Sequence, residues 1–202
     1  MSEERITTFD QLLSMVKGRE RKRLAIASAE GGEIIEAVKL ATEEKIVSAV
    51  LIGDQAKIKE MCSEKNLDLG QVEIINAPDP KLAAKAAVET VKQGKAEILM
   101  KGKVDTSTLL KAVLDKESGL RTGAFLSHVA VVEVSSYPKF MLVTDGGMNI
   151  RPDIKQKVEI IENAVEVAKR LRVERPKVAC LAAVELVNPD MQETVDAAGL
   201  VK

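Results

Sequence analysis

Polar residues that suit anion binding are concentrated between residues 97 and 149, where they alternate with apolar segments. Lys101 and Gly102 directly follow an apolar run, and Asp105 or Thr106 could cap a helix that starts next to them. A cation beside a helix N-terminus suits a phosphate or a carboxylate. Arg121 lies in the sequence GLRTG, and a guanidinium can hold phosphate through two parallel hydrogen bonds. A solvated lysine and an ordinary loop arginine are the alternatives.

A second group of polar residues follows closely. Ser127 and His128 begin an apolar segment, and Thr144 and Asp145 precede two glycines. A lone histidine in such a place is more often a hydrogen-bonded structural residue than a general base. Asp145 could accept a proton or cap a turn. Without an acid at a recognisable spacing, Ser127 and His128 do not indicate a catalytic triad.

The cysteines and the carboxylates suggest neither a metal site nor a disulfide. Cys62 and Cys180 are far apart, and each lies inside a regular segment. This pattern is typical of reduced cysteines in a cytosolic protein. The acid pairs Glu30 with Glu33 and Glu185 with Asp190 are typical of helix starts, and no spacing matches a metal motif.

Strand and helix signals alternate through the first half of the chain. Apolar runs predict strands over 23–27, 47–52, 72–75 and 97–100, each followed by a turn signal. Helical spacing predicts helices over 33–44, 55–65 and 81–92, the last with Asp79 as N-cap and Pro80 at its first position. A further helix is expected from Thr7–Asp10 through Val16. The alternation predicts an α/β fold with a parallel sheet.

The pattern changes after Gly123. Two strands over 127–134 and 139–143 are joined by a short connection, which indicates a hairpin. A long amphipathic helix over 152–171, a strand over 178–182 and a helix from about Pro189 are expected to follow. We therefore predict two domains, residues 1–125 and 126–202.

Composition narrows the function classes. The chain has 30 basic and 31 acidic residues, a net charge of -1, and 2% aromatic residues. Nucleic-acid binding needs a basic face and usually aromatic stacking, so it is not expected. No apolar run is long enough to cross a bilayer. We expect a cytoplasmic protein that forms a homo-oligomer and contacts neither nucleic acid nor membrane.

Several motifs together resemble the phosphate acetyl- and butyryltransferase family, and are nearest its butyryl branch. They are the sequences LMKG (99–102), SGLRTG (118–123), LSHV (126–129), TD with MN (144–145, 148–149), and AAVE with VNP (182–185, 187–189), together with Thr106, Leu109 and Leu110. The resemblance covers essentially the whole chain and is most specific in its second half.

The resemblance implies a two-domain α/β fold like that of isocitrate and isopropylmalate dehydrogenases, with the site between the domains. It also implies exchange of a short acyl group, butyryl or similar, between coenzyme A and inorganic phosphate, which are substrates rather than cofactors. Relatives continue beyond the position that matches Lys202, and catalysis is assigned in them to that later part. The second domain is therefore expected to be incomplete.

The residue chemistry is compatible with direct displacement. Phosphate is substantially ionised near neutral pH, because its second ionisation lies around pH 6. The reaction then needs two anionic substrates held together and donors for the carbonyl oxygen. We assign catalytic roles to Asp145 and Ser127, with Asp145 as a proton acceptor in the reverse direction. Substrate binding is assigned to Lys101, Gly102, Thr106, Arg121, His128, Thr144 and Asn149.

Two alternatives remain at this point. The chain could be a catalytically incomplete fragment that acts as an oligomerisation or interaction module, since an unpaired sheet edge favours association. It could also be another enzyme on the same fold, such as a decarboxylating dehydrogenase. The dehydrogenase would need a carboxylate cluster for a divalent metal and a nicotinamide site, and the sequence shows no convincing spacing for either.

Overall fold

The computed structural model describes residues 5–201, and their contacts divide them into two compact units. The sheet unit is Met15–Gly123, and the hairpin unit is the N-terminal segment up to Ser14 together with the chain from Ala124 onward. The division into domains 1–125 and 126–202 stays a prediction.

Four parallel strands form the centre of the sheet unit. They are β1 (Lys22–Ala27), β2 (Val47–Gly53), β3 (Val72–Asn76) and β4 (Ile98–Lys101), in the order β3-β2-β1-β4. Chain order reverses direction between β1 and β4, and ligands of open parallel sheets bind beyond the carboxyl ends of strands at such a point. Ala27 pairs with Lys101 there.

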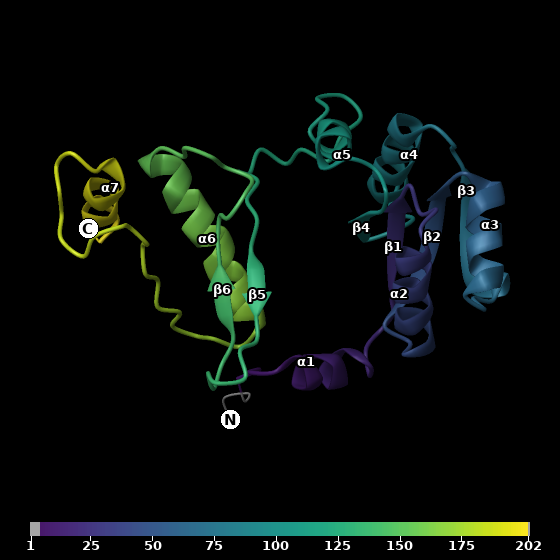
Figure 1. Cartoon of the computed structure of the whole chain (residues 1–202), viewed down its shortest axis with the longest axis horizontal. Helices are drawn as coiled ribbons and strands as arrows, with labels where there is room; N and C mark the ends of the chain where they lie inside the picture. Colours follow the sequence, from purple (N-terminus) through teal and green to yellow (C-terminus); the bar gives the residue numbers. More distant parts are fainter. Residues whose placement is uncertain (1–4, 202) are drawn as a thin grey trace. The chain divides into compact units, whose positions relative to one another are not determined.

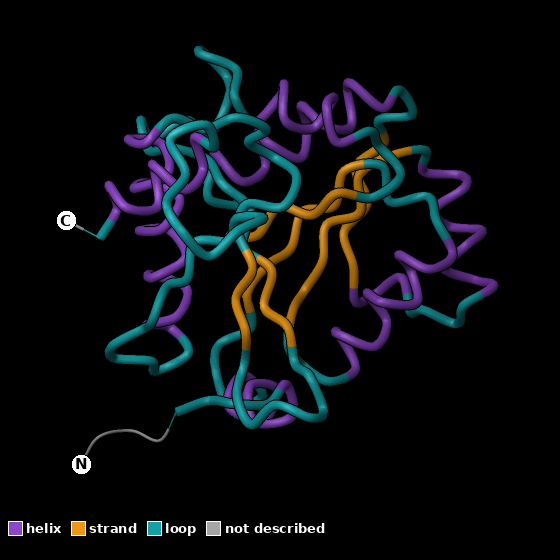
Figure 2. Tube along the Cα trace, turned by 60° about the vertical axis from the view of Figure 1, so that its left-hand side comes forward, coloured by secondary structure: helices purple, strands orange, loops and turns teal. Residues whose placement is uncertain are grey.

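Helices cover both faces of this sheet (Figures 1 and 2). Successive strand residues point to opposite faces. Leu24, Ile26 and Leu51 therefore pack with α2 (Gly32–Glu43) and α3 (Gln55–Glu64). Ala25, Ala27 and Ile52 pack with α4 (Pro80–Lys92) and α5 (Thr106–Val113). Burial on both faces explains why these strands read as continuous apolar runs.

The local signals of the first half are confirmed to within two residues. Asp79 is the N-cap of α4, where its side chain accepts from the N–H groups of Lys81 and Leu82, and Pro80 follows at the first position. The helix α1 (Phe9–Val16) ends where it was expected. A short 3₁₀ turn, η1 (Leu69–Gln71), precedes β3.

The hairpin unit contains β5 (Ala130–Val132) and β6 (Met141–Val143), which pair antiparallel, and two helices, α6 (Ile154–Arg170) and α7 (Gln192–Leu200). The hairpin prediction is confirmed, although both strands are shorter than expected. The N-terminal segment packs here too. Ile6 is buried and its N–H donates to the carbonyl oxygen of Leu171, and the Phe9 ring lies 4.9 Å from that of Phe140.

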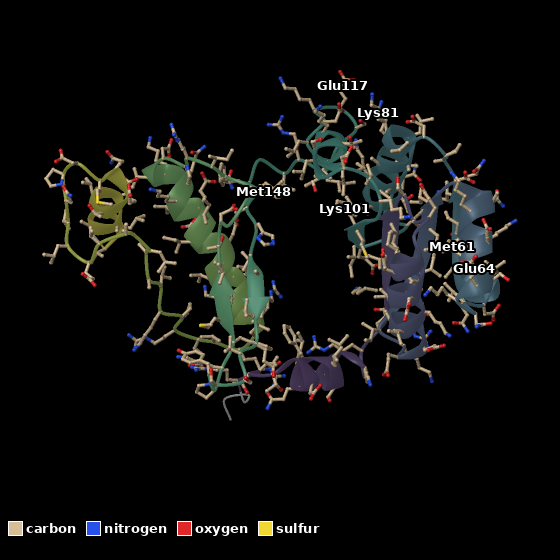
Figure 3. The ribbon with its side chains drawn as sticks, in the orientation of Figure 1. Met61, Glu64, Lys81, Lys101, Glu117 and Met148 are labelled. Carbon is tan, nitrogen blue, oxygen red and sulfur yellow. The ribbon has the colours of Figure 1, made fainter. Side chains whose placement is uncertain are left out.

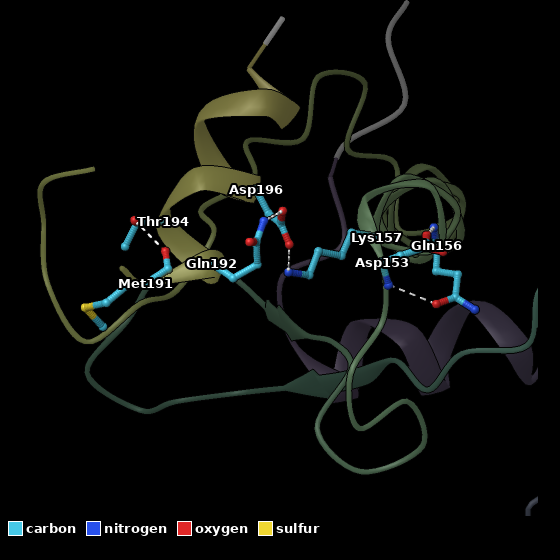
Figure 4. Close-up of polar contacts among 7 residues, drawn as sticks. All are labelled: Asp153, Gln156, Lys157, Met191, Gln192, Thr194 and Asp196. Atoms are coloured by element: carbon cyan, nitrogen blue, oxygen red, sulfur yellow. Dashed lines mark hydrogen bonds and ion pairs between the residues drawn. The ribbon is translucent and has the colours of Figure 1, made fainter. Parts of the chain in front are cut away.

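The contact of α7 with α6 is polar at its centre (Figure 4). Lys157 Nζ donates to Asp196 Oδ2 at 2.5 Å, and Gln192 Nε2 donates to the other carboxylate oxygen at 2.7 Å. These hydrogen bonds lower the pKa of Asp196. Asp153 and Gln156 form a capping box that starts α6.

The strand predicted over 178–182 is wrong. In the structure, the chain between α6 and α7 contains neither strand nor helix (Figure 1). Val178 and Leu181 are 55% and 88% exposed. A strand exists only if a neighbour satisfies its backbone groups, and within residues 5–201 this segment pairs with no strand. An apolar β-prone pattern alone therefore does not produce a strand.

None of the helices over residues 5–201 combines the length and the apolar character that a membrane span requires.

Candidate functional site

The first candidate residues lie at the carboxyl end of β4, in the sheet unit. Lys101 is the last residue of this strand (Figure 3). Its Nζ donates to the carbonyl oxygens of Gly102 and Val104, each at 3.2 Å, which leaves one of the three ammonium protons for a ligand. Asp105 holds the N-cap position of α5 without a side-chain cap, and the exposed Thr106 is the first residue of the helix.

Close packing against the end of β1 explains why residue 102 is a glycine. A Cβ there would collide with the backbone oxygens of Ala27 and Ser28 at the end of β1. The N–H groups of Gly102 and Lys103 donate to those same two carbonyls at 2.8 Å. The close neighbour is therefore the adjacent strand, and the predicted approach of a ligand to Gly102 stays a prediction.

Two unsatisfied polar atoms lie just beyond β1, on residues to which the sequence analysis assigned no role in the site. Ser28 Oγ and one oxygen of Glu30 are buried and find no partner within residues 5–201. The Glu30 carboxylate lies where a Cβ on Gly53 would be, at the end of β2. Unpaired buried polar groups are uncommon in proteins. Their place at the carboxyl edge, where the strand order reverses, is the expected place for a ligand site.

Arg121 is exposed and free at the end of the sheet unit. The preceding loop folds back on α5, with Asp115 accepting from the N–H groups of Glu117 and Ser118 and from the Ser118 hydroxyl. Arg121 itself makes no hydrogen bond or ion pair with the residues that the structure describes. Its guanidinium remains available for an anion.

The other candidates come together in the hairpin unit, around Asp145. Asp145 Oδ2 accepts from the backbone N–H of His128 at 3.1 Å and from Asn149 Nδ2 at 2.6 Å. Asp145 Oδ1 accepts from the N–H groups of Met148, at 2.9 Å, and Gly147, at 3.4 Å. The peptide bond between Thr144 and Asp145 is cis. Met148, one of these donors, lies in the turn that follows β6 (Figure 3).

These donors determine the charge state of Asp145. Partial burial by itself would raise the pKa of the carboxyl, but the donors from Met148, Asn149, His128 and Gly147 together outweigh it and lower the pKa to about 2. Asp145 is therefore ionised at neutral pH and holds a proton weakly. Of its two predicted roles, the geometry favours the turn, and proton acceptance stays a prediction.

The backbone of residues 125–128 is held from several sides. Thr144 Oγ1 donates to the carbonyl oxygen of His128 at 2.7 Å, and Asn149 Nδ2 donates to that of Leu126 at 3.1 Å. The His128 side chain is exposed, and no partner for its imidazole exists in the described part of the chain. The structural hydrogen bond expected for a lone histidine is thus absent from the imidazole.

One contact of this cluster was not predicted. Asn163, in the middle of α6, donates from Nδ2 to the carbonyl oxygen of Phe125 and to Ser127 Oγ, both at 2.9 Å. An asparagine within an amphipathic helix was the available signal, because asparagine is a weak helix former.

Over residues 5–201, no three histidines, cysteines or carboxylates are grouped to hold a metal ion.

Nearly the whole chain is similar to known acyltransferases. The family model described as phosphate acetyl/butaryl transferase matches residues 7–87 and 79–202. The chain belongs to this family. It is 47% identical over 194 residues to a phosphate butyryltransferase of Clostridium beijerinckii, which covers 96% of this chain and 64% of that protein. It is 40% identical over 194 residues to a phosphate acetyltransferase of Thermotoga maritima, covering 96% of this chain and 65% of that protein.

Solved structures agree with this assignment. A branched-chain phosphotransacylase from Enterococcus faecalis has a TM-score of 0.75 and 36% identity, covering 89% of this chain and 62% of that one. The predicted family is thereby confirmed, as is the mixed α/β fold with a parallel sheet. The chain spans just under two thirds of the length of these relatives.

Proposed function

We propose that the chain is a phosphate acyltransferase that moves a short acyl group, butyryl or similar, between coenzyme A and inorganic phosphate. The observation that carries the proposal is the 47% identity to a phosphate butyryltransferase over nearly the whole chain. The groups left free in the structure support it. The Arg121 guanidinium and the His128 imidazole suit an anion, and neither has a partner within residues 5–201.

The proposed reaction is a direct displacement. A phosphate oxygen attacks the thioester carbonyl, the carbon–sulfur bond breaks, and coenzyme A leaves as a thiolate while acyl phosphate forms. The leaving thiol has a pKa of about 8.5 by analogy with cysteine, so it can depart as thiolate without a strong acid. Ionised phosphate needs no strong base either. The chain's task is then to hold two anions and to stabilise the carbonyl oxygen.

We assign this task to residues of both units. Lys101, Gly102, Thr106 and Arg121 are proposed to bind substrate from the sheet unit, and His128, Thr144 and Asn149 from the hairpin unit. Ser127 is proposed as a donor to a substrate oxygen. Asp145, whose pKa is lowered to about 2, is proposed to fix the turn that carries these groups.

We also propose that the complete fold is the two-domain architecture of isocitrate and isopropylmalate dehydrogenases, that the protein forms a homo-oligomer, and that it works in the cytoplasm without a cofactor. The free cysteines, Cys62 and Cys180, support a reducing compartment.

A thiol-release assay tests the activity. Butyryl-CoA and acetyl-CoA are supplied with and without phosphate to this chain and to a chain extended through any downstream reading frame. We expect thiol release that requires phosphate and is faster with butyryl-CoA. Release that is independent of phosphate in both chains would contradict a phosphate acyltransferase, and faster release from acetyl-CoA would contradict only the butyryl preference.

A further inference from the structure

Asn163 lies on the partly buried face of α6, where an asparagine is unusual. Ile160, three residues earlier, is 5% exposed, and Val167, four residues later, is partly buried. Residues at these spacings share one helix face. Asparagine there weakens the helix and must satisfy its amide, so an apolar residue would be the ordinary choice.

The amide of Asn163 faces the segment that enters β5. Its Nδ2 lies 2.9 Å from the Phe125 carbonyl oxygen and 2.9 Å from Ser127 Oγ. A carbonyl oxygen can only accept, so the group facing Phe125 must be the NH₂ group of the amide. Its second proton then goes to Ser127 Oγ. The direction of both hydrogen bonds follows from chemistry alone.

The consequence concerns the Ser127 proton. A hydroxyl has one proton to donate, and Ser127 Oγ is already the acceptor of the bond from Asn163. Its own proton is therefore directed to another acceptor. Within residues 5–201, no acceptor takes the Ser127 proton. Ser127 is partly exposed, so an acceptor from outside the chain can reach it.

The backbone beside Ser127 leaves the side chain little freedom to move away. Leu126 is held by Asn149, and His128 by both Asp145 and Thr144. The bond from Asn163 holds Ser127 Oγ in place and prevents its proton from pointing toward Asn163. Fixed donors of this kind stabilise developing or existing negative charge without reorganisation.

We propose that Asn163 is a positioning residue that makes Ser127 a hydrogen-bond donor to a phosphate oxygen of the substrate. This inference rests on the proposed phosphate acyltransferase activity. Asn163 does not touch the substrate itself, and its whole effect passes through Ser127.

A double-mutant cycle on phosphate binding tests the proposal. Inorganic phosphate is titrated calorimetrically into the chain and into its Asn163→Ala, Ser127→Ala and doubly substituted variants. Each single substitution should weaken phosphate binding roughly tenfold, as expected for losing one bond to a charged group. The double substitution should weaken it no further. In the transfer assay, KM for phosphate should rise while KM for butyryl-CoA stays the same.

Controls separate this effect from damage to the fold. Glu162→Gln changes the exposed neighbour on the same helix and should alter nothing. If Asn163→Ala unfolds the hairpin unit, Asn163→Asp keeps the size of the side chain and replaces the donor to Phe125 and Ser127 by an acceptor. It should then capture the Ser127 proton and weaken phosphate binding at least as much, because it also adds a negative charge.

The possible failures are distinct. Two results would overturn the role of Asn163 alone, provided that the unsubstituted chain shows phosphate-dependent transfer. One is unchanged phosphate binding in both Asn163 variants. The other is a double variant whose loss of phosphate affinity equals the product of the two single losses. Absence of both phosphate binding and transfer in the unsubstituted chain would overturn the proposed function and this inference together.

Discussion

In the sheet unit, β1 and β2 each have a paired strand on both sides, whereas β5 and β6 of the hairpin unit pair only with each other. The first unit is built on apolar layers, with Ile26 and Leu51 fully buried. The second buries fewer apolar side chains, and side-chain hydrogen bonds around Asp145 and Asp196 connect its elements. Apolar burial specifies a fold broadly, while polar networks fix particular groups in place. The candidate residues of the hairpin unit are therefore held in place by more hydrogen bonds than those of the sheet unit, although the hairpin unit buries fewer apolar side chains.

The largest effect is expected in the sheet core. Leu51→Ala should lower the free energy of unfolding by about 3 kcal/mol, because it leaves a cavity in a fully buried layer. Leu181→Ala, at a position 88% exposed, should change it by less than about 0.5 kcal/mol. Urea denaturation of both variants gives the comparison. Equal losses would show that the segment around Leu181 is buried in solution.

Close backbone packing gives the next effect. Gly102→Ala should cost about 2–3 kcal/mol, because the added methyl meets backbone oxygens that cannot move aside. Gly146→Ala, in the turn of the hairpin unit, has open space around the new Cβ and should cost far less. Thermal unfolding distinguishes the two variants. A tolerated Gly102→Ala would mean that the end of β1 can shift.

The polar network should give a smaller effect that depends on pH. Asp145→Asn replaces one acceptor oxygen by a donor that faces N–H groups and should cost about 2 kcal/mol at pH 7. Because the folded pKa of about 2 lies below the ordinary 3.8, the stabilisation from Asp145 is complete above about pH 4 and is lost as pH falls toward 2.

Denaturation curves at several pH values measure that loss. The difference between the chain and Asp145→Asn should shrink as the pH is lowered through this range. Asp105→Asn is a matched control in the sheet unit, since Asp105 makes no side-chain cap bond. A difference that stays constant down to pH 2 would mean that Asp145 is not held by these donors.

Arg121→Ala should have the smallest effect on stability, within about 0.5 kcal/mol, because the side chain is exposed and unpaired in the described structure. It should nevertheless raise KM for phosphate roughly tenfold, through loss of a charge-assisted bond. Steady-state kinetics at varied phosphate concentrations measure the change. An unchanged phosphate dependence would remove Arg121 from the site.

Features set by neighbouring residues could be predicted from the sequence, whereas contacts between distant residues could not. The start of α4 was readable because Asp79 accepts from amides two and three residues away, and Pro80 has a fixed φ that suits the first helical position. The strand expected at 178–182 failed because its partner would have to come from elsewhere in the chain. Asn163 and Ser127 are 36 residues apart, so their hydrogen bond was invisible to local patterns. The sequence likewise marked Gly102 without showing which neighbour approaches it.

Formation of butyryl phosphate is the most direct measure of phosphate acyltransferase activity in this chain. The chain is incubated with butyryl-CoA and inorganic phosphate, and the phosphorus resonances are followed by NMR. We expect an acyl phosphate signal that grows in proportion to the thiol released. Release of thiol without an acyl phosphate, in this chain and in an extended one, would contradict that activity.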